Sequence, residues 1–503
     1  MVLVNWGSGQ LPGISNGDRE WKMSDLRTFL EQLAKDNELV KLKKKIQKGD
    51  EVFSIMWRLN STNGPAFQAD VEGFDIPIVA NVFGTKNRWA RACGFPQNLE
   101  VGEYIERFMN LMLSKDKTAE PTVVKTAACK ETKFAGAEVD LGRYPVLKWH
   151  KNDGAPYITM AMVVTQDPRL GRNVGIYRVS VMNRNTLTVL TNANQDIGIH
   201  VSSARTRGLS SIPCAIVVGA EPAVYMAACT KVDLKEDELK FASHFTGGKS
   251  IEIVKCESND IHVPASSEIV IEGDLQLKET VQEGPMSEWH GYHEEAMRTL
   301  VMNVKCITQR RKPVFITTVA GHEHAEEEVM HVIQQQGSMN RQCKQRITGF
   351  VRAGCPQAGR GFTVVVAINK RFPGWGKHAI AQAYSIPYVA LTANNIIIVD
   401  EDIDPHSSEE VMWALSTRVD PERDVIMFPP TPVNPLNPAA RRRPEVFERT
   451  GITDVSVCSK MGIDATLKKF GELEGHYRPA SIPVKPDKET YERICAQWSE
   501  YGF

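Results

Sequence analysis

Several common sequence signatures are missing from this chain of 503 residues. Its ten cysteines are scattered and none forms a C-x-x-C pair, which argues against a zinc site or a disulfide framework and is typical of a reducing cytosol. The opening MVLVNWGSGQLPG has no basic region followed by a long apolar run, so it does not resemble a signal peptide. No apolar run approaches the length of a membrane span. These absences predict a cytoplasmic protein that has no membrane partner.

The chain also has no excess of charge. Its formal net charge is −1, so nothing in the composition calls for nucleic acid or an anionic surface. Neither G-x-G-x-x-G nor G-x-x-x-x-G-K-[ST] occurs, so the motifs of dinucleotide and P-loop sites are absent. The 42% apolar and 24% charged residues are typical of a globular protein with a large core.

The pattern of apolar residues divides the chain into four parts. Residues 1–122 read as an α/β domain, and residues 123–312 contain many short β-rich runs separated by Gly, Pro, Asn and Asp, typical of a barrel or sandwich-like sheet. Residues 313–484 alternate strand and helix patterns, which favours a parallel α/β layer. Residues 485–503 predict one last helix.

Local signals add detail to this division. Ser24 is the expected N-cap of the first helix, and Ser407 with Glu410 forms an expected capping box. The strand pattern that begins at Pro313 is expected in the C-terminal layer. The proline-rich segment 427–444 is expected to lack regular structure.

Two carboxylates, Glu283 and Glu288, lie five residues apart around the Gly284-Pro285 step. Two neighbouring carboxylates push their pKa values apart, so that one can hold a proton while the other is ionised. The pattern therefore suits acid/base chemistry. A solvated loop with incidental acids is the alternative, and a glycosidase pair uses two carboxylates as well.

Arg178 lies in a strand pattern, on the same face as Val174, Ile176 and Ser180. A charge on an apolar strand face needs a partner, and a carboxylate or phosphate is the natural one. The alternative is a structural arginine that forms a salt bridge at the end of the sheet.

Oxygen ligands also occur in the sequence. A hard, oxygen-rich site for Mg²⁺ or Mn²⁺ could be formed by Asn173, Asp196 and Glu238. Their spacing does not prove that they lie close together in the fold. The alternative is that the acids near Glu238 belong to a solvated helix end. His322 and His324 lack the i, i+4 spacing of a helical zinc pair. The acids that follow them favour a helix N-terminus, which leaves His322 a pocket-lining role at most.

A series of fragments extends over nearly the whole chain: "HKNDGAPYIT", "NVGIYR", "NQDIGIH", "EDELKFASHFTGG", "IEIVKCESNDIHVPASSEIVIEG", "EGPMSEWHGY", "VDEDIDPHSSEEVMWALSTRVDPERD" and "SKMGIDAT". Taken in this order, they resemble the UbiD-type decarboxylase family, which includes the ferulic acid decarboxylases. Each fragment is weak by itself, but the ordered set is specific.

The resemblance implies a fold with an N-terminal α/β domain, a central split β-barrel that binds flavin, and a C-terminal α/β domain used for oligomerisation. It also implies prenylated FMN as cofactor and reversible decarboxylation of an aromatic or α,β-unsaturated acid. The family's catalytic network falls on Arg178, Glu283 and Glu288, with Glu288 as proton donor and Glu283 holding Arg178. An electron sink is needed because no side chain can stabilise the carbanion that loss of CO₂ from an aromatic or alkenyl carbon leaves.

Cofactor-binding positions are carried over in the same way. The resemblance implies that Asn173, Asp196 and Glu238 hold the divalent ion, Mn²⁺ or Mg²⁺, that bridges to the cofactor phosphate. The carbonyls of Ala227 and Thr230 match positions that hold K⁺. The remaining residues expected to line the flavin are Val174, Gly175, Ile176, Tyr177, Arg178, Gln195 and Ala228.

Two departures from the fungal members stand out: Asp196 replaces a histidine ligand, and "IPYVALTANNIII" lacks their phosphate-contacting lysine. The bacterial-looking segments favour an aromatic or heteroaromatic acid of hydroxybenzoate, indole, pyrrole, naphthoate or phenazine type. The alternatives are a cinnamate-type acrylic acid decarboxylase, a flavin-binding assembly subunit without its own catalysis, and a conventional flavin reductase. Expected partners are CO₂, a flavin prenyltransferase that supplies the cofactor, and further copies of the chain in a dimer or larger oligomer.

Overall fold

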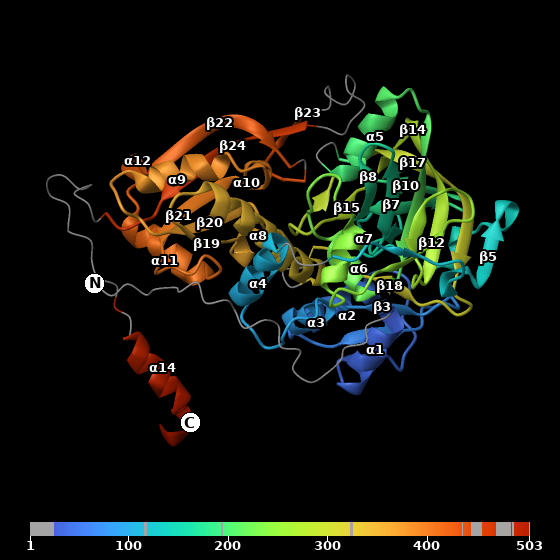
Figure 1. Cartoon of the computed structure of the whole chain (residues 1–503), viewed down its shortest axis with the longest axis horizontal. Coiled ribbons are helices and arrows are strands. Elements are labelled where there is room, and N and C mark those ends of the chain that lie inside the picture. The colour runs from blue at the N-terminus through green and yellow to red at the C-terminus, as the bar shows by residue number, and fades with distance from the viewer. Residues whose placement is uncertain are drawn as a thin grey trace.

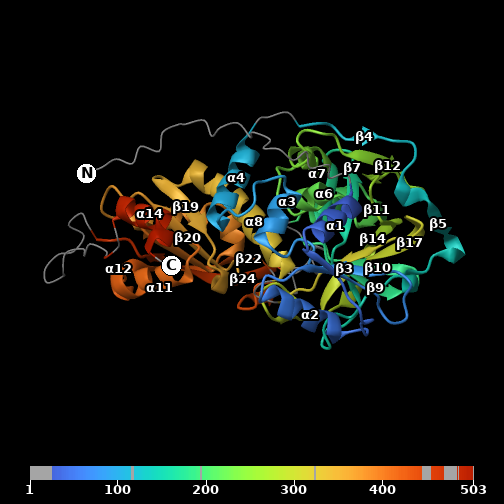
Figure 2. The ribbon, with the colours of Figure 1, turned by 90° about the horizontal axis from the view of Figure 1, so that it is seen from below.

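The computed structural model describes residues 25–114, 118–192, 195–321, 325–434, 436–443, 455–468, 484 and 487–501. The chain forms two large bodies side by side (Figures 1 and 2). One body combines the N-terminal elements with the β-rich centre, and the other is the C-terminal α/β layer. Helices α4 and α8 lie where the two bodies meet.

The N-terminal sheet has four strands in the order β1-β2-β3-β18. Helix α1 packs against it with a buried face of Leu26, Phe29, Leu30 and Leu33, the face that the apolar spacing predicts. The elements are α1 (Leu26–Lys35), β1 (Leu39–Lys41), α2 (Asp50–Asn60), β2 (Ala66–Ala69), β3 (Ile78–Ala80), α3 (Lys86–Ala92) and α4 (Val101–Leu113).

The central domain is built on a nine-stranded sheet in which every pairing is antiparallel. Its order is β6-β9-β10-β17-β14-β11-β7-β8, and β5 also pairs with β17. The strands are β5 (Thr132–Ala135), β6 (Tyr157–Ile158), β7 (Met162–Asp167), β8 (Gly171–Ile176), β9 (Val179–Asn183), β10 (Thr186–Val189), β11 (Ser211–Val218), β14 (Ile269–Glu283) and β17 (Met297–Gln309). Within the described chain no sheet closes into a barrel.

Smaller elements decorate the central sheet. They are β4 (Thr122–Val123), α5 (Asp196–Thr206), α6 (Pro222–Ala228), α7 (Glu238–Phe241), β12 (Glu252–Lys255), β13 (His262–Pro264), β15 (Met286–Ser287) and β16 (His293–Glu294). Strands β15 and β16 form a short hairpin directly after β14, so the long β14 strand delivers the chain to this hairpin.

The C-terminal sheet has the order β19-β20-β21-β24-β22, with β23 paired to β24. Only β20, β21 and β24 are mutually parallel, and antiparallel strands flank them. Its elements are α8 (Glu326–Arg346), β19 (Phe350–Gly354), β20 (Thr363–Ile368), α9 (Trp375–Tyr384), α10 (Pro387–Thr392), β21 (Asn395–Asp400), α11 (Ser408–Arg418), α12 (Pro421–Asp424), β22 (Val425–Val433), β23 (Arg441–Arg443), β24 (Val455–Asp464) and α14 (Lys488–Ala496).

The prediction of a multidomain α/β fold with a β-rich centre and a final helix is confirmed. The strand pattern after Pro313 was assigned to the wrong sheet: it forms β18 (Phe315–Thr317), which pairs in parallel with β3 of the N-terminal sheet. A short apolar strand fits either sheet, and only tertiary packing decides between them. The proposed bounds of the four parts remain predictions.

Three local predictions have different outcomes. Ser407 caps α11 as expected by accepting the backbone N–H of Glu410. The reciprocal half of the expected capping box does not form, because the Ser407 N–H donates to the Asp404 carbonyl and the Glu410 carboxylate accepts the Asp404 N–H. The first helix is capped by Asp25, which accepts the Thr28 N–H at 2.9 Å; Ser24 lies outside the described residues. The proline-rich segment is not irregular throughout, because β22 and β23 form within it. Strand β22 ends the sheet and has a register shift after Phe428, a setting that tolerates proline.

No helix in the described part of the chain combines the length and the apolar character needed to cross a bilayer.

Candidate active site

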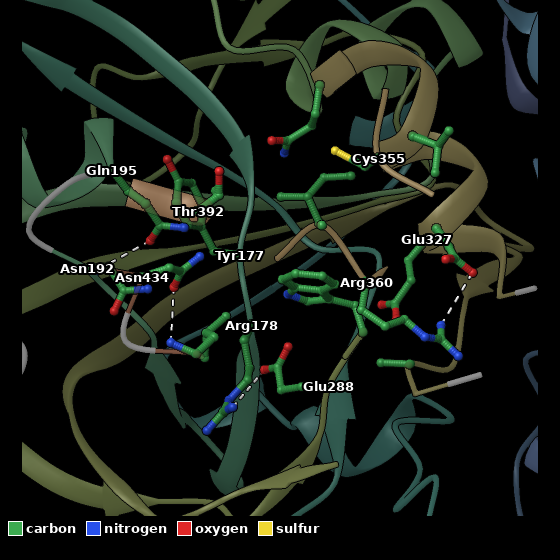
Figure 3. Close-up of a pocket in the computed structure, with 18 of the residues that line it drawn as sticks. Tyr177, Arg178, Asn192, Gln195, Glu288, Glu327, Cys355, Arg360, Thr392 and Asn434 are labelled. Carbon is green, nitrogen blue, oxygen red and sulfur yellow. Dashed lines mark hydrogen bonds and ion pairs between the residues drawn. The ribbon is translucent and has the colours of Figure 1, made fainter. Parts of the chain in front are cut away.

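The centre of the site is an arginine held between two carboxylates. Arg178 follows strand β8, Glu283 is the last residue of β14, and Glu288 follows β15 in the hairpin. The guanidinium Nη2 lies 2.8 Å from Glu283 Oε2, and Nη1 lies 2.9 Å from Glu288 Oε1. The structure therefore brings together the three residues that the sequence put forward as a network. Figure 3 shows the contact between Arg178 and Glu288.

Glu283 is fully enclosed by partners. Arg178 reaches it through both Nε and Nη2, with Nε 3.2 and 3.1 Å from the two carboxylate oxygens. The hydroxyl of Tyr157 donates a further hydrogen bond to Oε1. Burial, with the added charge of Glu283, raises the pKa of Tyr157, so this hydroxyl keeps its proton and remains a donor. The Glu283 side chain is only 1% exposed.

Arg178 stays cationic despite its burial. Burial alone lowers the pKa of its guanidinium, but the charges of Glu283 and Glu288 outweigh that effect and raise the pKa overall. The guanidinium is thus a permanent positive charge with its donors in a fixed fork.

Glu288 has a different environment. One oxygen accepts the bond from Arg178, and the side chain is 12% exposed at the wall of a cavity. Burial raises the pKa of Glu288, and the attraction of Arg178 offsets this only in part. Glu288 can therefore hold a proton, which is the property that a general acid needs.

Two glycines allow the segments around these residues to approach closely. A Cβ on Gly154 would lie 2.0 Å from the carbonyl oxygen of Gly284, so a side chain there would push the hairpin away. Gly284 has φ +107°, a conformation that favours glycine. Asp153 accepts the backbone N–H of Ser287 at 3.0 Å and anchors the hairpin from the other side. These contacts fix the step between Glu283 and Glu288.

A cavity of about 320 Å³ opens next to Arg178 and Glu288. Figure 3 shows that its walls come from both bodies of the molecule. Trp289 joins them by stacking on Phe362 with ring centroids 5.0 Å apart. The central domain contributes Thr159, Ile176, Tyr177, Arg178, Leu190, Asn192, Gln195, Met286, Glu288 and Trp289, and the later elements contribute Glu327, Gln336, Gln357, Arg360, Tyr388, Thr392 and Asn434, among others.

The predicted cofactor-lining residues divide into two groups. Ile176, Tyr177, Arg178 and Gln195 line this cavity. The other three do not line it. Val174 and Gly175 lie on β8, and Ala228 lies at the end of α6. Gly175 cannot carry a side chain, because a Cβ there would lie 2.6 Å from the ring of Tyr177.

The predicted divalent-ion residues lie around the same stretch of β8. Glu238, which is 5% exposed, accepts the Val174 N–H at 3.0 Å. Asn173 accepts the Tyr177 hydroxyl at 3.3 Å, and its Nδ2 has no hydrogen-bond partner within the described part of the chain. Lys231 Nζ lies 2.5 Å from Asp196 Oδ1. In the described chain, no group of three His, Cys, Asp or Glu residues forms a metal site, and this set contains two carboxylates and one amide.

Electrostatics nevertheless favour a cation beside Glu238. Burial raises the pKa of its carboxyl to about 8, with Asp196 and Asp237 adding to the effect. The predicted K⁺ carbonyls are close together: Ala227 O accepts the Thr230 N–H at 2.9 Å, and Thr230 O accepts the Val232 N–H at 3.1 Å. Each carbonyl retains a second lone pair.

Sequence reasoning did not find Tyr157, the donor to Glu283, or the cavity wall supplied by the C-terminal layer. Tyr157 occurs within the "HKNDGAPYIT" fragment, but a tyrosine in a buried strand carries no signal of its own. Arg360 in that wall has φ +45°, which sequence cannot reveal. His322 and His324 lie outside the described residues.

Comparison with known protein families identifies the family of this chain. Three domain models of 3-octaprenyl-4-hydroxybenzoate carboxy-lyase match successive parts of the chain: the N-terminal domain over residues 30–108, the Rift-related domain over residues 122–323, and the C-terminal domain over residues 330–465. The chain belongs to the UbiD family. As a UbiD-type protein it is a decarboxylase, that is, a carboxy-lyase.

Solved UbiD-class structures agree with this assignment. The vanillic acid decarboxylase of Sedimentibacter hydroxybenzoicus in its closed form is 28% identical with a TM-score of 0.82, over 95% of this chain and 99% of that chain. The UbiD-class enzyme HmfF from Pelotomaculum thermopropionicum, in complex with FMN, is 27% identical with a TM-score of 0.76, over 93% and 100%. An evolved dimeric form of HmfF in complex with prenylated FMN is 26% identical with a TM-score of 0.74, over 93% and 100%.

Proposed function

We propose that this UbiD protein catalyses the reversible, non-oxidative decarboxylation of an aromatic or heteroaromatic carboxylic acid with prenylated FMN. The observation that carries the proposal is that Arg178 binds two carboxylates whose surroundings differ. Glu283 has all its partners, while Glu288 faces the cavity and has a raised pKa. A proton donor beside a fixed cation suits the exchange of CO₂ for a proton at one carbon.

The residues present fit the cofactor. The buried Glu238 carboxyl, raised in pKa and without a cationic partner in the described chain, would be neutralised by a divalent ion that also binds a phosphate. Asn173 and Asp196 would complete this Mn²⁺ or Mg²⁺ site, and the carbonyls of Ala227 and Thr230 would hold K⁺. Bound prenylated flavin supplies an electron sink for the negative charge left on the substrate carbon when CO₂ departs.

The chain itself supplies orientation and the proton. Arg178 attracts the substrate carboxylate towards the Glu288 end of the cavity, and its fork stays in place because Glu283 holds it from behind. Glu288 then gives its proton to the carbon that has lost CO₂. The resulting Glu288 carboxylate is stabilised by Arg178 Nη1 until a new proton arrives. With abundant CO₂ the same residues would support carboxylation.

The test uses protein co-produced with a flavin prenyltransferase, the enzyme expected to supply the cofactor. We expect an absorption spectrum distinct from that of FMN, release of CO₂ from members of a panel of aromatic and heteroaromatic acids, and exchange of the product's ring proton with D₂O. Protein that carries intact prenylated flavin but neither decarboxylates nor exchanges any member of the panel would refute the proposal. Preferential turnover of cinnamates would replace the aromatic-acid class with the acrylic one.

The metal assignment has its own test. Extensive chelation, followed by elemental analysis, should release the flavin, because Asn173, Asp196 and Glu238 would lose the ion that links them to the phosphate. Metal-free protein that retains flavin and full activity would show that the ion site is elsewhere.

Assembly and location complete the proposal. We expect a homodimer or larger oligomer formed through the C-terminal layer, and a cytoplasmic location, in line with ten free cysteines. Light scattering that gives a monomer at micromolar concentration would contradict the first expectation.

A further inference from the structure

A second cavity, of about 700 Å³, lies on the other side of the first turns of α8. Its walls come from loops of the N-terminal domain, α3, the starts of α4 and α8, and the C-terminal layer. Glu328, Val332, Cys355 and Gln357 line both cavities, so these residues separate the two spaces. Neither Arg178 nor Glu288 lines the second cavity, so it is not part of the catalytic site described above.

Arg88 on α3 lines the second cavity, and its buried guanidinium has no ion-pair partner in the described chain. Arg88 is 2% exposed, its Nη2 donates to the carbonyl of Gly64 at 3.0 Å, and its Nε has no hydrogen-bond partner among the described residues. Among the described residues no carboxylate oxygen comes within 4.0 Å of it. Buried charges in proteins are ordinarily paired, so this one is an exception that needs an explanation.

Arg91, on the same helix, is a buried arginine whose charge is paired with carboxylates of the protein. It is 5% exposed, and its Nη1 lies 2.8 Å from Asp36 while its Nη2 lies 3.4 Å from Glu38. The two arginines are equally buried, but only Arg91 is neutralised by the protein. Arg88 is the one that lines the cavity.

Nearby acids do not compensate for Arg88. Burial lowers the pKa of Arg88, and the charges of Glu38 and Glu326 counter this only in part. The net pKa is about 10. Glu326 is engaged by the Phe83 N–H at 2.6 Å, and burial raises the pKa of its carboxyl to about 6. An anion in the cavity would supply the missing negative charge.

The surroundings limit which anion fits. Two carboxylates, Glu38 and Glu328, line the cavity together with Lys86 and Arg88, so these side chains have no net positive charge that would favour a ligand with more than one negative charge. Pro65, Val101, Val329 and Ile333 give the cavity an apolar wall. A guanidinium binds a carboxylate through two parallel hydrogen bonds, and the apolar wall suits an aromatic or aliphatic body.

We propose that this cavity is a second ligand site, which binds a small monocarboxylic acid with its carboxylate on Arg88 and its apolar body against α8. The site is separate from the proposed decarboxylation chemistry and does not depend on it. Because Glu328 and Val332 of α8 form walls of both cavities, an acid bound here lies one helix away from the catalytic cavity.

Titration calorimetry with benzoate on full-length, FMN-loaded Arg178→Gln protein tests the proposal, because this background removes the cation that would bind an aromatic carboxylate in the catalytic cavity. Charge-assisted hydrogen bonds are worth about 1.5–3 kcal/mol, so Arg88→Gln should weaken this binding by about 10- to 150-fold. Val329→Phe leaves Arg88 intact but narrows the second cavity, since Val329 lines that cavity and not the first, and it should also weaken the binding. The second variant keeps the test valid if Arg88→Gln folds poorly.

Arg91→Gln is the matched control, since it removes an equally buried arginine from the same helix outside the cavity. It should retain benzoate binding. Inorganic phosphate should compete weakly, because Glu38 disfavours a dianion. The proposal is overturned if the Arg178→Gln protein does not bind benzoate, if both cavity variants made in that background bind it with unchanged affinity, or if phosphate binds as tightly as benzoate.

Discussion

The two carboxylates that share Arg178 are five residues apart, yet their surroundings differ in the way that two roles require. Glu283 ends a long, doubly paired strand and receives hydrogen bonds from Arg178 and Tyr157. Glu288 lies in a short hairpin, receives one bond from Arg178 and faces a cavity. A saturated carboxylate positions the guanidinium, whereas an undersaturated one can exchange a proton.

Replacing Glu288 should have the largest effect. Glu288→Gln keeps the size and the hydrogen bond to Arg178 but removes the transferable proton. General acid catalysis is worth about 10²–10⁴-fold, so turnover should fall by about that factor and D₂O exchange into the product should fall with it. Steady-state kinetics and mass spectrometry on protein with an intact prenylated flavin spectrum measure both.

The control for that variant is Glu295→Gln, which changes an exposed carboxylate in the same hairpin and should leave turnover unchanged. Wild-type exchange in Glu288→Gln would show that the proton comes from another group.

Replacing Glu283 should have a smaller effect of a different kind. Glu283→Gln removes the charge that holds Arg178, which on the scale of charge-assisted hydrogen bonds lowers turnover by about 10- to 150-fold. Arg178 would then act more strongly on Glu288 and lower its pKa. The alkaline limb of the pH–rate profile should therefore move to lower pH. An unmoved limb with reduced turnover would mean that the two carboxylates are not coupled through Arg178.

The pH dependence of the wild type gives a third test. Because burial raises the pKa of Glu288, its protonated form persists above the range of an ordinary carboxyl group. Decarboxylation should be supported while Glu288 is protonated and should fall by about tenfold per pH unit once the pH exceeds its pKa. In Glu288→Gln the residual rate should lack this alkaline limb. Retention of the limb would assign it to another group.

The smallest effect is expected at the supporting tyrosine. Tyr157→Phe removes one of the hydrogen bonds to Glu283 while Arg178 keeps its contacts, so turnover should fall only a few-fold. The free energy of unfolding should fall by about 1–3 kcal/mol, as for a lost buried hydrogen bond to a charged group. Denaturant titration and kinetics on the same preparation separate the two effects. A loss as large as that of Glu283→Gln would indicate that Tyr157 contributes to the chemistry directly.

The sequence by itself determined the β-rich centre flanked by α/β regions, the amphipathic face of α1, the cap of α11 and the three charged residues of the site. Each of these rests on local spacing or on an ordered set of motifs, which the chain carries without reference to its fold. The sequence alone also showed two acids around Gly284-Pro285 and predicted that Arg178 needs a negatively charged partner.

Only the tertiary structure decided which acid is surrounded by donors and which lines a cavity with a single bond from Arg178, because that depends on Tyr157 and on a cavity wall brought from the C-terminal layer. It also placed β18 in the N-terminal sheet and distinguished Arg88 from Arg91, two arginines that look alike in the sequence. The physical reason is that desolvation and ion pairing depend on groups distant along the chain, and these set the pKa of a side chain more than its own sequence neighbours do.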